Sequence, residues 1–348
     1  MRNLVDKCYN FMQLNYLFWK KAFHQKIKIS PFEGISLLSK GFYGETKIIY
    51  QLTKENYKDY LSDYKRLKAK FINGRYSFVL NNKVVFERVY KDNVKIPKTL
   101  ALIEKGEIIP FGSDIKDVNS LIEYAKKNLK VVIKPVDGGG GSGVFIVKFD
   151  NGNLYIDNNK VAEDDLQKKI CRLDNYIINE FVIQGEFAKK LYPQSLNTMR
   201  ILTMLDPSTK KAFIPFAVQR IGTKSSAPAD NWTQGGISAE IDIETGEIKE
   251  GASFPLSGKV EWLKEHPETG YRFYGLKIPG WENIKEEIIA LAEKHPYIKY
   301  AGWDVALTDS GITIIEGNNC TGMNLLQIHR PILKDERVKN FYKFYGII

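Results

Sequence analysis

The chain has 348 residues, a net charge of +10 and 43% hydrophobic residues, which is typical of a soluble globular protein with one large or two to three closely packed domains. It has no run of eighteen apolar residues, which excludes a membrane-spanning helix, and polar residues interrupt its apolar start, which argues against a signal peptide. The three scattered cysteines fit neither a disulfide framework nor a zinc site, so we expect a cytoplasmic protein.

The positive charge is concentrated in the first hundred residues, which carry 20 Lys and Arg against 8 Asp and Glu, whereas the other 248 carry 31 against 33. Basic and aromatic residues are interleaved there, as in Tyr16, Trp19, Lys20 and Phe23. We interpret residues 1–80 as a basic helical region with an aromatic face against the core and solvated lysines. The alternative is peripheral contact with an anionic membrane. No nucleic-acid-binding signature occurs, so we expect no nucleic-acid partner.

Helical and strand-like segments alternate through the next part of the chain. Charged and apolar residues at helical spacing predict a helix over 54–70, which Asn73 and Gly74 end. Residues 81–130 then form a separate predicted segment. Its expected elements are a helix from Asn82 to Tyr90, a strand over 99–103 and a helix over 117–129.

The remainder of the chain is mostly strands. We predict strands over 131–133, 144–149, 154–156, 176–183, 199–205, 212–219, 237–243, 301–306 and 312–316. Predicted helices lie at 161–171, 258–264 and 281–294. Interleaved strands and helices indicate an α/β or α+β fold rather than a helical bundle. We expect residues 131–185 to form a small lid and residues 186–348 a larger unit that provides the other wall of a cleft.

A glycine-rich loop follows the strand that ends at Lys134. Its residues are Gly138, Gly139, Gly140, Gly141, Ser142 and Gly143. A dinucleotide-binding fingerprint would open a helix, but a strand follows here, and a Walker A lysine would follow the glycines rather than precede them. Glycines let backbone N–H groups approach phosphate oxygens, and the lysine adds a positive charge. The pattern therefore favours phosphate binding over a flexible surface hairpin.

Two carboxylates lie on the last predicted pair of strands. The turn over 308–311 places Asp304 and Glu316 near each other, and Asn318 points to the same side as Glu316 if the strand continues. Carboxylate and amide oxygens suit magnesium shared with nucleotide phosphates. The apolar neighbours of these carboxylates indicate burial, where an unpaired charge is costly, and this favours a metal over two surface carboxylates.

These motifs, in this order, resemble those of ATP-grasp enzymes. The likeness rests on Lys134 before the glycine loop, Glu180 in Ile-Asn-Glu-Phe-Val, and Asp304 with Glu316 and Asn318. The segments Ser195-Leu-Asn-Thr-Met-Arg-Ile201, Asp230-Asn231, Gly235-Gly236 and Glu316-Gly-Asn resemble, more narrowly, the sugar-transfer-associated ATP-grasp family, which is related to α-L-glutamate-ligase-like proteins. The likeness extends from about Asn82 to Gln327.

The resemblance implies a nucleotide cleft between two antiparallel sheets that binds ATP and Mg²⁺. It implies phosphate contacts from Lys83 and Lys134, adenine contacts from the backbone of Glu180 and Val182, and ribose contacts from Glu186. Lys83 has an alternative as a solvated helix lysine. Arg200 resembles the arginine that steadies the transferred phosphoryl group, with a structural ion pair as its alternative. The hinge departs from the family pattern, since it reads Asn-Glu-Phe-Val rather than a paired-acid motif.

The resemblance also implies carboxylate–amine ligation through an acyl phosphate, with Lys134 and Arg200 as the catalytic residues. Small-molecule or sugar-linked carboxylates and amines in surface polysaccharide synthesis are the expected substrates. The candidates for the acceptor pocket are Asn197, Arg220, Asn231, Gly235 and Gly236. Arg220 suits a carboxylate, with an exposed ion pair as the alternative. A kinase with a hydroxyl acceptor and a non-catalytic nucleotide-binding scaffold remain alternative functions.

Overall fold

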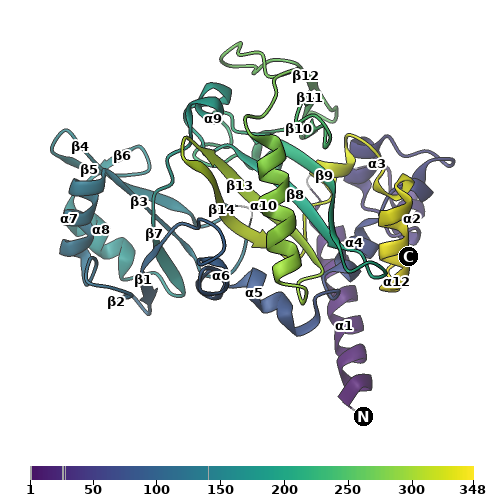
Figure 1. Cartoon of the computed structure of the whole chain (residues 1–348), viewed down its shortest axis with the longest axis horizontal. Coiled ribbons are helices and arrows are strands. Elements are labelled where there is room, and N and C mark those ends of the chain that lie inside the picture. Colours follow the sequence, from purple (N-terminus) through teal and green to yellow (C-terminus); the bar gives the residue numbers. More distant parts are fainter. Residues whose placement is uncertain (1, 26, 28, 140) are drawn as a thin grey trace.

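Two antiparallel sheets of seven strands each form the framework of the protein. The computed structural model describes residues 2–25, 27, 29–139 and 141–348. The smaller unit lies at the left of Figure 1, the larger sheet lies in the middle, and the first helices lie with the last helix at the right. The expected α+β class is confirmed, with helices over much of the first ninety residues.

The small sheet has the strand order β2-β1-β7-β3-β4-β5-β6. Its strands are β1 (Thr99–Glu104), β2 (Glu107–Pro110), β3 (Lys130–Pro135), β4 (Phe145–Asp150), β5 (Asn153–Ile156), β6 (Asn159–Val161) and β7 (Tyr176–Glu180). Alternate residues such as Val131 and Ile133 face a core closed by helices α7 (Val118–Asn128) and α8 (Glu163–Ile170). Asp117 caps α7 by accepting a hydrogen bond from the Ser120 amide.

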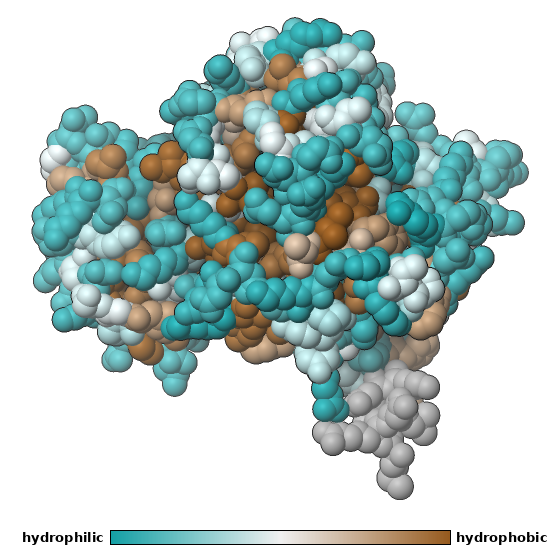
Figure 2. All heavy atoms as spheres, viewed as in Figure 1, coloured by the Kyte–Doolittle hydropathy of each residue, from teal (hydrophilic) through white to brown (hydrophobic). Residues whose placement is uncertain are grey.

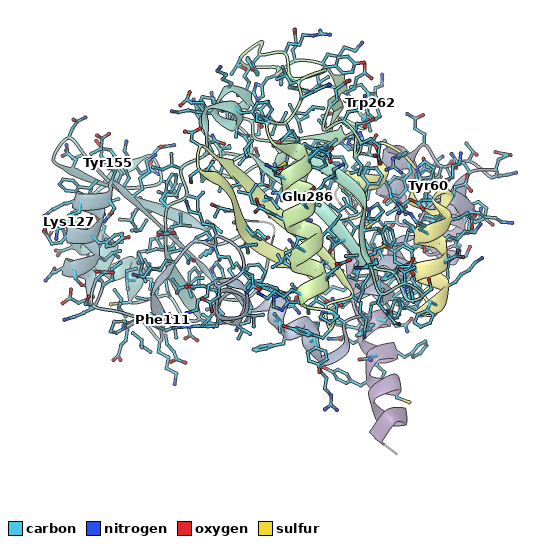
Figure 3. The ribbon with its side chains drawn as sticks, viewed as in Figure 1. Tyr60, Phe111, Lys127, Tyr155, Trp262 and Glu286 are labelled. Carbon is cyan, nitrogen blue, oxygen red and sulfur yellow. The ribbon has the colours of Figure 1, made fainter. Side chains whose placement is uncertain are left out.

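The large sheet has the order β12-β11-β10-β9-β8-β13-β14. Its strands are β8 (Thr198–Leu205), β9 (Ala212–Ile221), β10 (Ile237–Ile241), β11 (Ile248–Ser253), β12 (Trp262–Leu263), β13 (Tyr300–Thr308) and β14 (Gly311–Asn318). Helix α10 (Trp281–Lys294) covers one face with Trp281, Ile284 and Ile288, at the spacing of one helical stripe. Glu286 lies on its solvent side (Figure 3).

The remaining helices come from the early and late parts of the chain. The early helices are α1 (Arg2–Phe23), α2 (Pro31–Ser39), α3 (Gly44–Tyr50), α4 (Asp63–Ala69), α5 (Ser77–Asn81) and α6 (Lys83–Tyr90), and the late helices are α9 (Glu186–Leu191), α11 (Asn324–Gln327) and α12 (Glu336–Phe344). Helices α5, α6 and α9 pack in the same core as α10, whereas α4, α11 and α12 pack on the other face of the large sheet. Leu61 and Ile72 pack in one core with Phe341 and Tyr342, so the N-terminal region is built into the large unit.

Buried amides join these helices to the sheet. The side chain of Gln327 accepts from the Leu61 amide at 2.8 Å and donates to the Leu61 carbonyl and to the Tyr50 hydroxyl, each at 3.0 Å. Asn73 accepts from the Lys299 amide at 2.8 Å and donates to the Tyr300 carbonyl at 2.6 Å. Figure 2 shows hydrophilic residues around the outline of the visible face, with hydrophobic residues showing between them near its middle.

Several sequence-based boundaries need correction. The predicted helix over 258–264 is wrong, because Trp262 and Leu263 pair with β11 as an edge strand and Gly258 has a positive φ of 83°. The small sheet also includes β1 and β2, which lie ahead of the predicted lid segment 131–185. Strand β7 ends at Glu180 rather than 183. In the part of the chain that the structure describes, no helix is long and apolar enough to cross a membrane.

Replacing Gln327 with Leu tests the junction between the two chain ends. The substitution leaves the buried N–H and C=O groups of Leu61 without their side-chain partner and removes one of the two hydrogen bonds of the Tyr50 hydroxyl, so we expect it to lower the free energy of unfolding by about 2–4 kcal/mol. The midpoint of urea unfolding measures the loss. Gln167→Leu on the exposed face of α8 is the matched control and should change stability by less than about 0.5 kcal/mol. Equal losses in both variants would contradict the assigned role of Gln327.

Candidate active site

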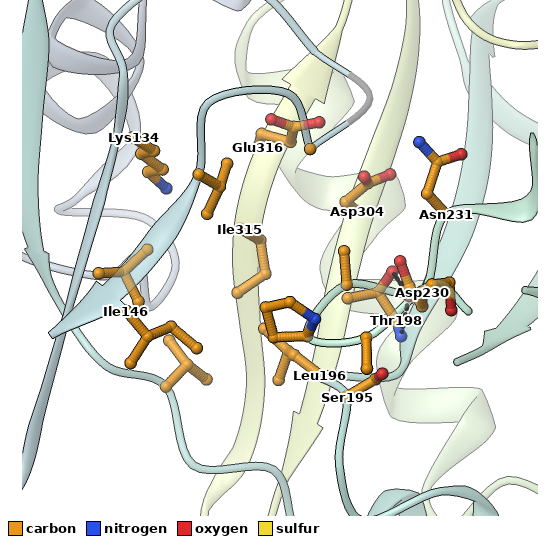
Figure 4. A pocket seen from close by; sticks show the side chains of 18 of the residues that line it. Lys134, Ile146, Ser195, Leu196, Thr198, Asp230, Asn231, Asp304, Ile315 and Glu316 are labelled. Carbon is orange, nitrogen blue, oxygen red and sulfur yellow. Dashed lines mark hydrogen bonds between the residues drawn. The ribbon is translucent and has the colours of Figure 1, made fainter. Parts of the chain in front are cut away.

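A cavity of about 1340 Å³ lies between the two sheets. The small sheet contributes residues of β3 and β4, and the large sheet contributes residues of β8, β9, β13 and β14. Figure 4 shows Lys134 and Ile146 on the small-sheet side, facing Asp304, Ile315 and Glu316 of the large sheet. The site is therefore built from strands that are far apart in the sequence.

One end of the cavity is apolar. Ile146 of β4, Leu196 before β8 and Ile315 of β14 lie close together in Figure 4, away from the carboxylate of Glu316. The hinge segment after β7 adds Glu180 and Val182 to the wall. A slot with apolar side chains on two faces and backbone polar groups along its edge suits a planar heterocyclic base.

The glycine loop joins β3 to β4, as the sequence predicts. Gly138, Gly139, Gly141 and Ser142 line the cavity, whereas Gly140 lies outside the described residues. Gly138 and Gly141 have φ of 106° and 72°, values that disfavour other residues. Gly143 lies behind the wall, where an added Cβ would meet the Tyr176 hydroxyl at 2.7 Å. The loop thus keeps its backbone close to the cavity.

Two lysines reach the same end of the cavity as the glycine loop. Lys83 begins α6, and its Nζ donates to the Val136 and Gly138 carbonyls at 3.4 and 3.3 Å. Lys134 is on β3. Burial, and then the positive charge of Lys83, lower the pKa of Lys134 to about 8. A second positive charge so close by makes this a site that favours an anion.

Asp304 lies at the centre of a buried ion-pair cluster. Arg200 of β8 makes a bidentate contact with it, with Nη2–Oδ2 at 3.0 Å, and Arg220 of β9 adds an Nη1–Oδ2 contact at 2.7 Å. Arg220 also pairs with Asp230, whose carboxylate accepts from the amide and hydroxyl of Thr198 at 2.7 and 2.6 Å. Burial by itself raises the pKa of Asp304, but the two guanidinium groups outweigh it and hold that pKa below its ordinary value.

Glu316 is the cross-strand neighbour of Asp304 in the β13–β14 pair, as the hairpin predicts. Burial, and then the charge of Asp304, raise the pKa of Glu316. Asn318 continues the strand, and its buried Nδ2 has no hydrogen-bond partner in the described part of the chain. Two carboxylates and an amide are oxygen donors that suit magnesium, and a cation would offset the repulsion at Glu316. These residues therefore fit a magnesium ion.

The prediction that burial would leave the charge of Asp304 unpaired is wrong, because both of its carboxylate oxygens accept hydrogen bonds from arginine. Binding of a cation through Asp304 requires it to release at least one of these contacts. Among the described residues there is no cluster of three or more His, Cys, Asp or Glu side chains. The candidate donor set is thus limited to Asp304, Glu316 and Asn318.

The proposed acceptor residues are only partly brought together. Arg220 lines the cavity, but in a buried ion pair rather than an exposed one, and Asn231 lines it as the cap of a short 3₁₀ helix. Asn197 is buried, and its Nδ2 donates to the Gln184 side chain and to nearby carbonyls. Asn197 therefore shapes the wall from behind.

Three further predicted residues lie away from the cavity wall. Gly235 and Gly236 pack against their own loop, where an added Cβ at Gly236 would meet the Asp230 carbonyl at 2.7 Å. Glu186 is exposed and pairs with Lys189 at 3.0 Å. These positions give no support to direct ligand contacts.

Sequence reasoning missed two polar residues of the site, Thr198 and Asp230. Thr198 is two residues before Arg200 on β8, so strand alternation places both on one face, and that signal was available. Asp230 lies in an irregular loop whose path has no periodic signal. Apolar lining residues such as Leu196 and Ile146 were also not singled out.

The sequence profile described as sugar-transfer associated ATP-grasp matches residues 63–341. No curated protein matches the chain in sequence.

Three solved structures illustrate the likeness. The ATP-grasp ligase PsnB complexed with minimal precursor has 13% identity and a TM-score of 0.40, with 79% of this chain and 63% of that chain covered. D-alanine–D-alanine ligase from Bacillus anthracis has 14% identity and a TM-score of 0.40, covering 77% and 69%. A RiPP-associated ATP-grasp ligase from Chryseobacterium gregarium, in complex with ADP and a leader and core peptide, has 13% identity and a TM-score of 0.41, covering 85% and 71%. The chain spans less than two thirds of the length of PsnB.

A double-mutant cycle tests the ion-pair cluster. Asp230→Leu leaves Arg220 buried with one partner fewer, so we expect a loss of about 3–5 kcal/mol in the free energy of unfolding. Arg220→Met/Asp230→Leu removes both charges and should lose less than the two single variants combined. Denaturant unfolding of all four proteins measures the coupling. Strictly additive losses would show that Arg220 and Asp230 do not interact.

Proposed function

The chain belongs to the sugar-transfer associated ATP-grasp family, and we propose from this premise that it is an ATP-dependent carboxylate–amine ligase. The observation that carries the proposal is the meeting of Lys83, Lys134 and the glycine loop with Arg200, Asp304 and Glu316 across one cavity. ATP-grasp ligases as a class form carbon–nitrogen bonds. The reaction of this chain and its substrates are what we propose here.

The cavity accommodates ATP in one orientation. The adenine enters the apolar slot beside Ile146 and Leu196 and meets the backbone of Glu180 and Val182. The triphosphate then extends toward the glycine loop, Lys83 and Lys134, because these supply the positive charge and the close backbone approach that phosphates require. The reverse orientation would place phosphate charge against Ile315 and Leu196, which is unfavourable.

The proposed reaction has two steps. A carboxylate oxygen of the first substrate attacks the γ-phosphorus and ADP leaves, which gives an acyl phosphate; an amine then attacks the acyl carbon, phosphate leaves and an amide forms. Arg200 and Lys134 stabilise the negative charge on the transferred group and hold it in line with the carboxylate. A magnesium ion held by Asp304, Glu316 and Asn318 would supply further positive charge at the phosphate oxygens.

The acceptor side of the cavity is formed by the loop between β9 and β10. Ser226, Asp230, Asn231 and Trp232 of this loop line the cavity. We propose that the acceptor substrates are small or sugar-linked carboxylates and amines, such as a sugar acid and an amino acid of surface polysaccharide synthesis, and that the reaction takes place in the cytoplasm. The polar side chains of this loop support a hydroxyl-rich acceptor over an apolar one.

Neutralising the two carboxylates tests the proposed chemistry. We expect Asp304→Asn and Glu316→Gln each to lower ATP turnover by at least about a thousandfold, because each removes a charged donor to the magnesium ion that would align the phosphate groups. Asp164→Asn on exposed α8 is the control and should be neutral. Turnover is followed with carboxylate–amine pairs by release of free phosphate and by mass spectrometry. A stable phosphorylated product would favour a kinase, and unchanged turnover in both variants would reject the site.

The lowered pKa of Lys134 makes ATP affinity depend on pH. Lys134 in the free protein loses its proton above about pH 8, whereas bound phosphate stabilises the charged form, so ATP binding takes up a proton there. We expect the Kd for ATP to rise by up to about tenfold per pH unit above pH 8. Calorimetric titration at a series of pH values measures this slope. Lys134→Arg, which stays charged, should flatten the slope, and an equally steep slope in that variant would contradict the assignment.

A further inference from the structure

Helix α1 presents a stripe of large apolar side chains to solvent. Its members are Tyr9, Met12, Tyr16, Trp19 and Phe23, which we call the α1 stripe. Tyr16 is 62% exposed, Trp19 47% and Phe23 80%. The spacing of three and four residues keeps all five within an arc of about 80° along a helix stretch of roughly 21 Å. In the described part of the chain, these side chains remain largely uncovered.

A different face of α1 holds the helix to the protein. Leu14 and Phe18 are buried and pack with Tyr43 and Leu67, and the Phe18 ring stacks on Tyr43 at 5.0 Å between centroids. These residues lie on the side of the helix opposite the stripe. Figure 1 shows the N-terminal half of α1 projecting beyond the body of the molecule. The stripe is therefore not needed to anchor the helix, and its exposure calls for a partner.

The charge of the N-terminal region indicates what kind of partner the α1 stripe binds. The first hundred residues carry an excess of 12 positive charges, whereas the rest of the chain is almost neutral. Lys20 lies next to the stripe, with its Nζ 5.6 Å from the Tyr16 ring centroid. A second copy of this chain would bring two such basic regions together, and the bulky aromatic residues do not suit the seam of a coiled coil. An anionic surface attracts the basic region and does not require the aromatic side chains to fit a coiled-coil seam.

We propose that the α1 stripe binds the surface of a bilayer that contains anionic phospholipids. Tyr, Trp and Phe side chains partition into the interface between headgroups and acyl chains, while Lys20 contacts the negative headgroups. The helix lies in the plane of the surface and does not span the membrane. This assignment is independent of the ligase reaction, because no residue of the α1 stripe lines the cavity.

Vesicle sedimentation with the full-length chain tests the proposal. The protein should sediment with vesicles of mixed phosphatidylcholine and phosphatidylserine, and weakly or not at all with vesicles of phosphatidylcholine alone. Tyr16→Gln/Phe23→Gln should lower the partition coefficient on the anionic vesicles at least about tenfold. Raised salt should weaken binding of the wild-type chain, because headgroup attraction is screened.

A matched control separates the stripe from surface hydrophobicity in general. Phe344→Gln removes an aromatic residue of α12 that is 66% exposed, and it should leave vesicle binding unchanged. ATP binding and the melting temperature of each variant show that the fold is intact. Absence of binding to anionic vesicles, equal binding to neutral vesicles, or an equal loss in the Phe344→Gln control would overturn the proposal. So would a concentration-dependent dimer that the stripe variant abolishes, since a second copy would then be the partner.

Discussion

Charge balance on one face of the large sheet is the constraint on which the rest of the structure depends. Four charged side chains are buried together on this face, those of Arg200, Arg220, Asp304 and Asp230. The cost of removing each charge from water is offset by its ion pairs with the others. The partners come from β8, β9, β13 and the loop after β9, so the strands have to assemble in one register for the charges to meet. Asp230 also fixes the path of its loop by accepting hydrogen bonds from Thr198. The same contacts that neutralise the cluster therefore shape the cavity wall that this loop forms.

The small sheet contributes a different kind of charge. Lys134 has no carboxylate within ion-pair distance among the described residues, and burial beside Lys83 lowers its pKa. The large sheet faces it with Glu316, whose pKa is raised. The wall of the small sheet thus favours an anion beside Lys134, whereas the wall of the large sheet favours a cation beside Glu316. The gap between them suits a ligand that carries both anionic groups and cations. The charged groups on the two walls therefore define the site together with the apolar slot.

The local parts of this arrangement could be predicted from the sequence, and the distant parts could not. The glycine hairpin after Lys134 and the pairing of Asp304 with Glu316 depend on short turns and strand alternation, and both are confirmed. The partners of Arg220 depend on the path of an irregular loop, which has no periodicity, so an acceptor role was assigned to a residue already engaged by Asp230 and Asp304. Residues 258–264 look helical by composition, yet the open edge of β11 takes Trp262 and Leu263 as a strand. Tertiary pairing there outweighs a weak local preference.

The joining of early and late helices has a consequence for how the protein is made. Leu61, Ala69 and Ile72 find their apolar partners in Tyr300, Phe341 and Ile347, which leave the ribosome roughly 240–280 residues later. At about 5–20 residues per second, the early helices wait on the order of 10–60 s before these partners emerge. During synthesis the apolar faces of the early helices therefore remain open until these partners emerge. Helix α12 thereby completes the core that these early helices begin.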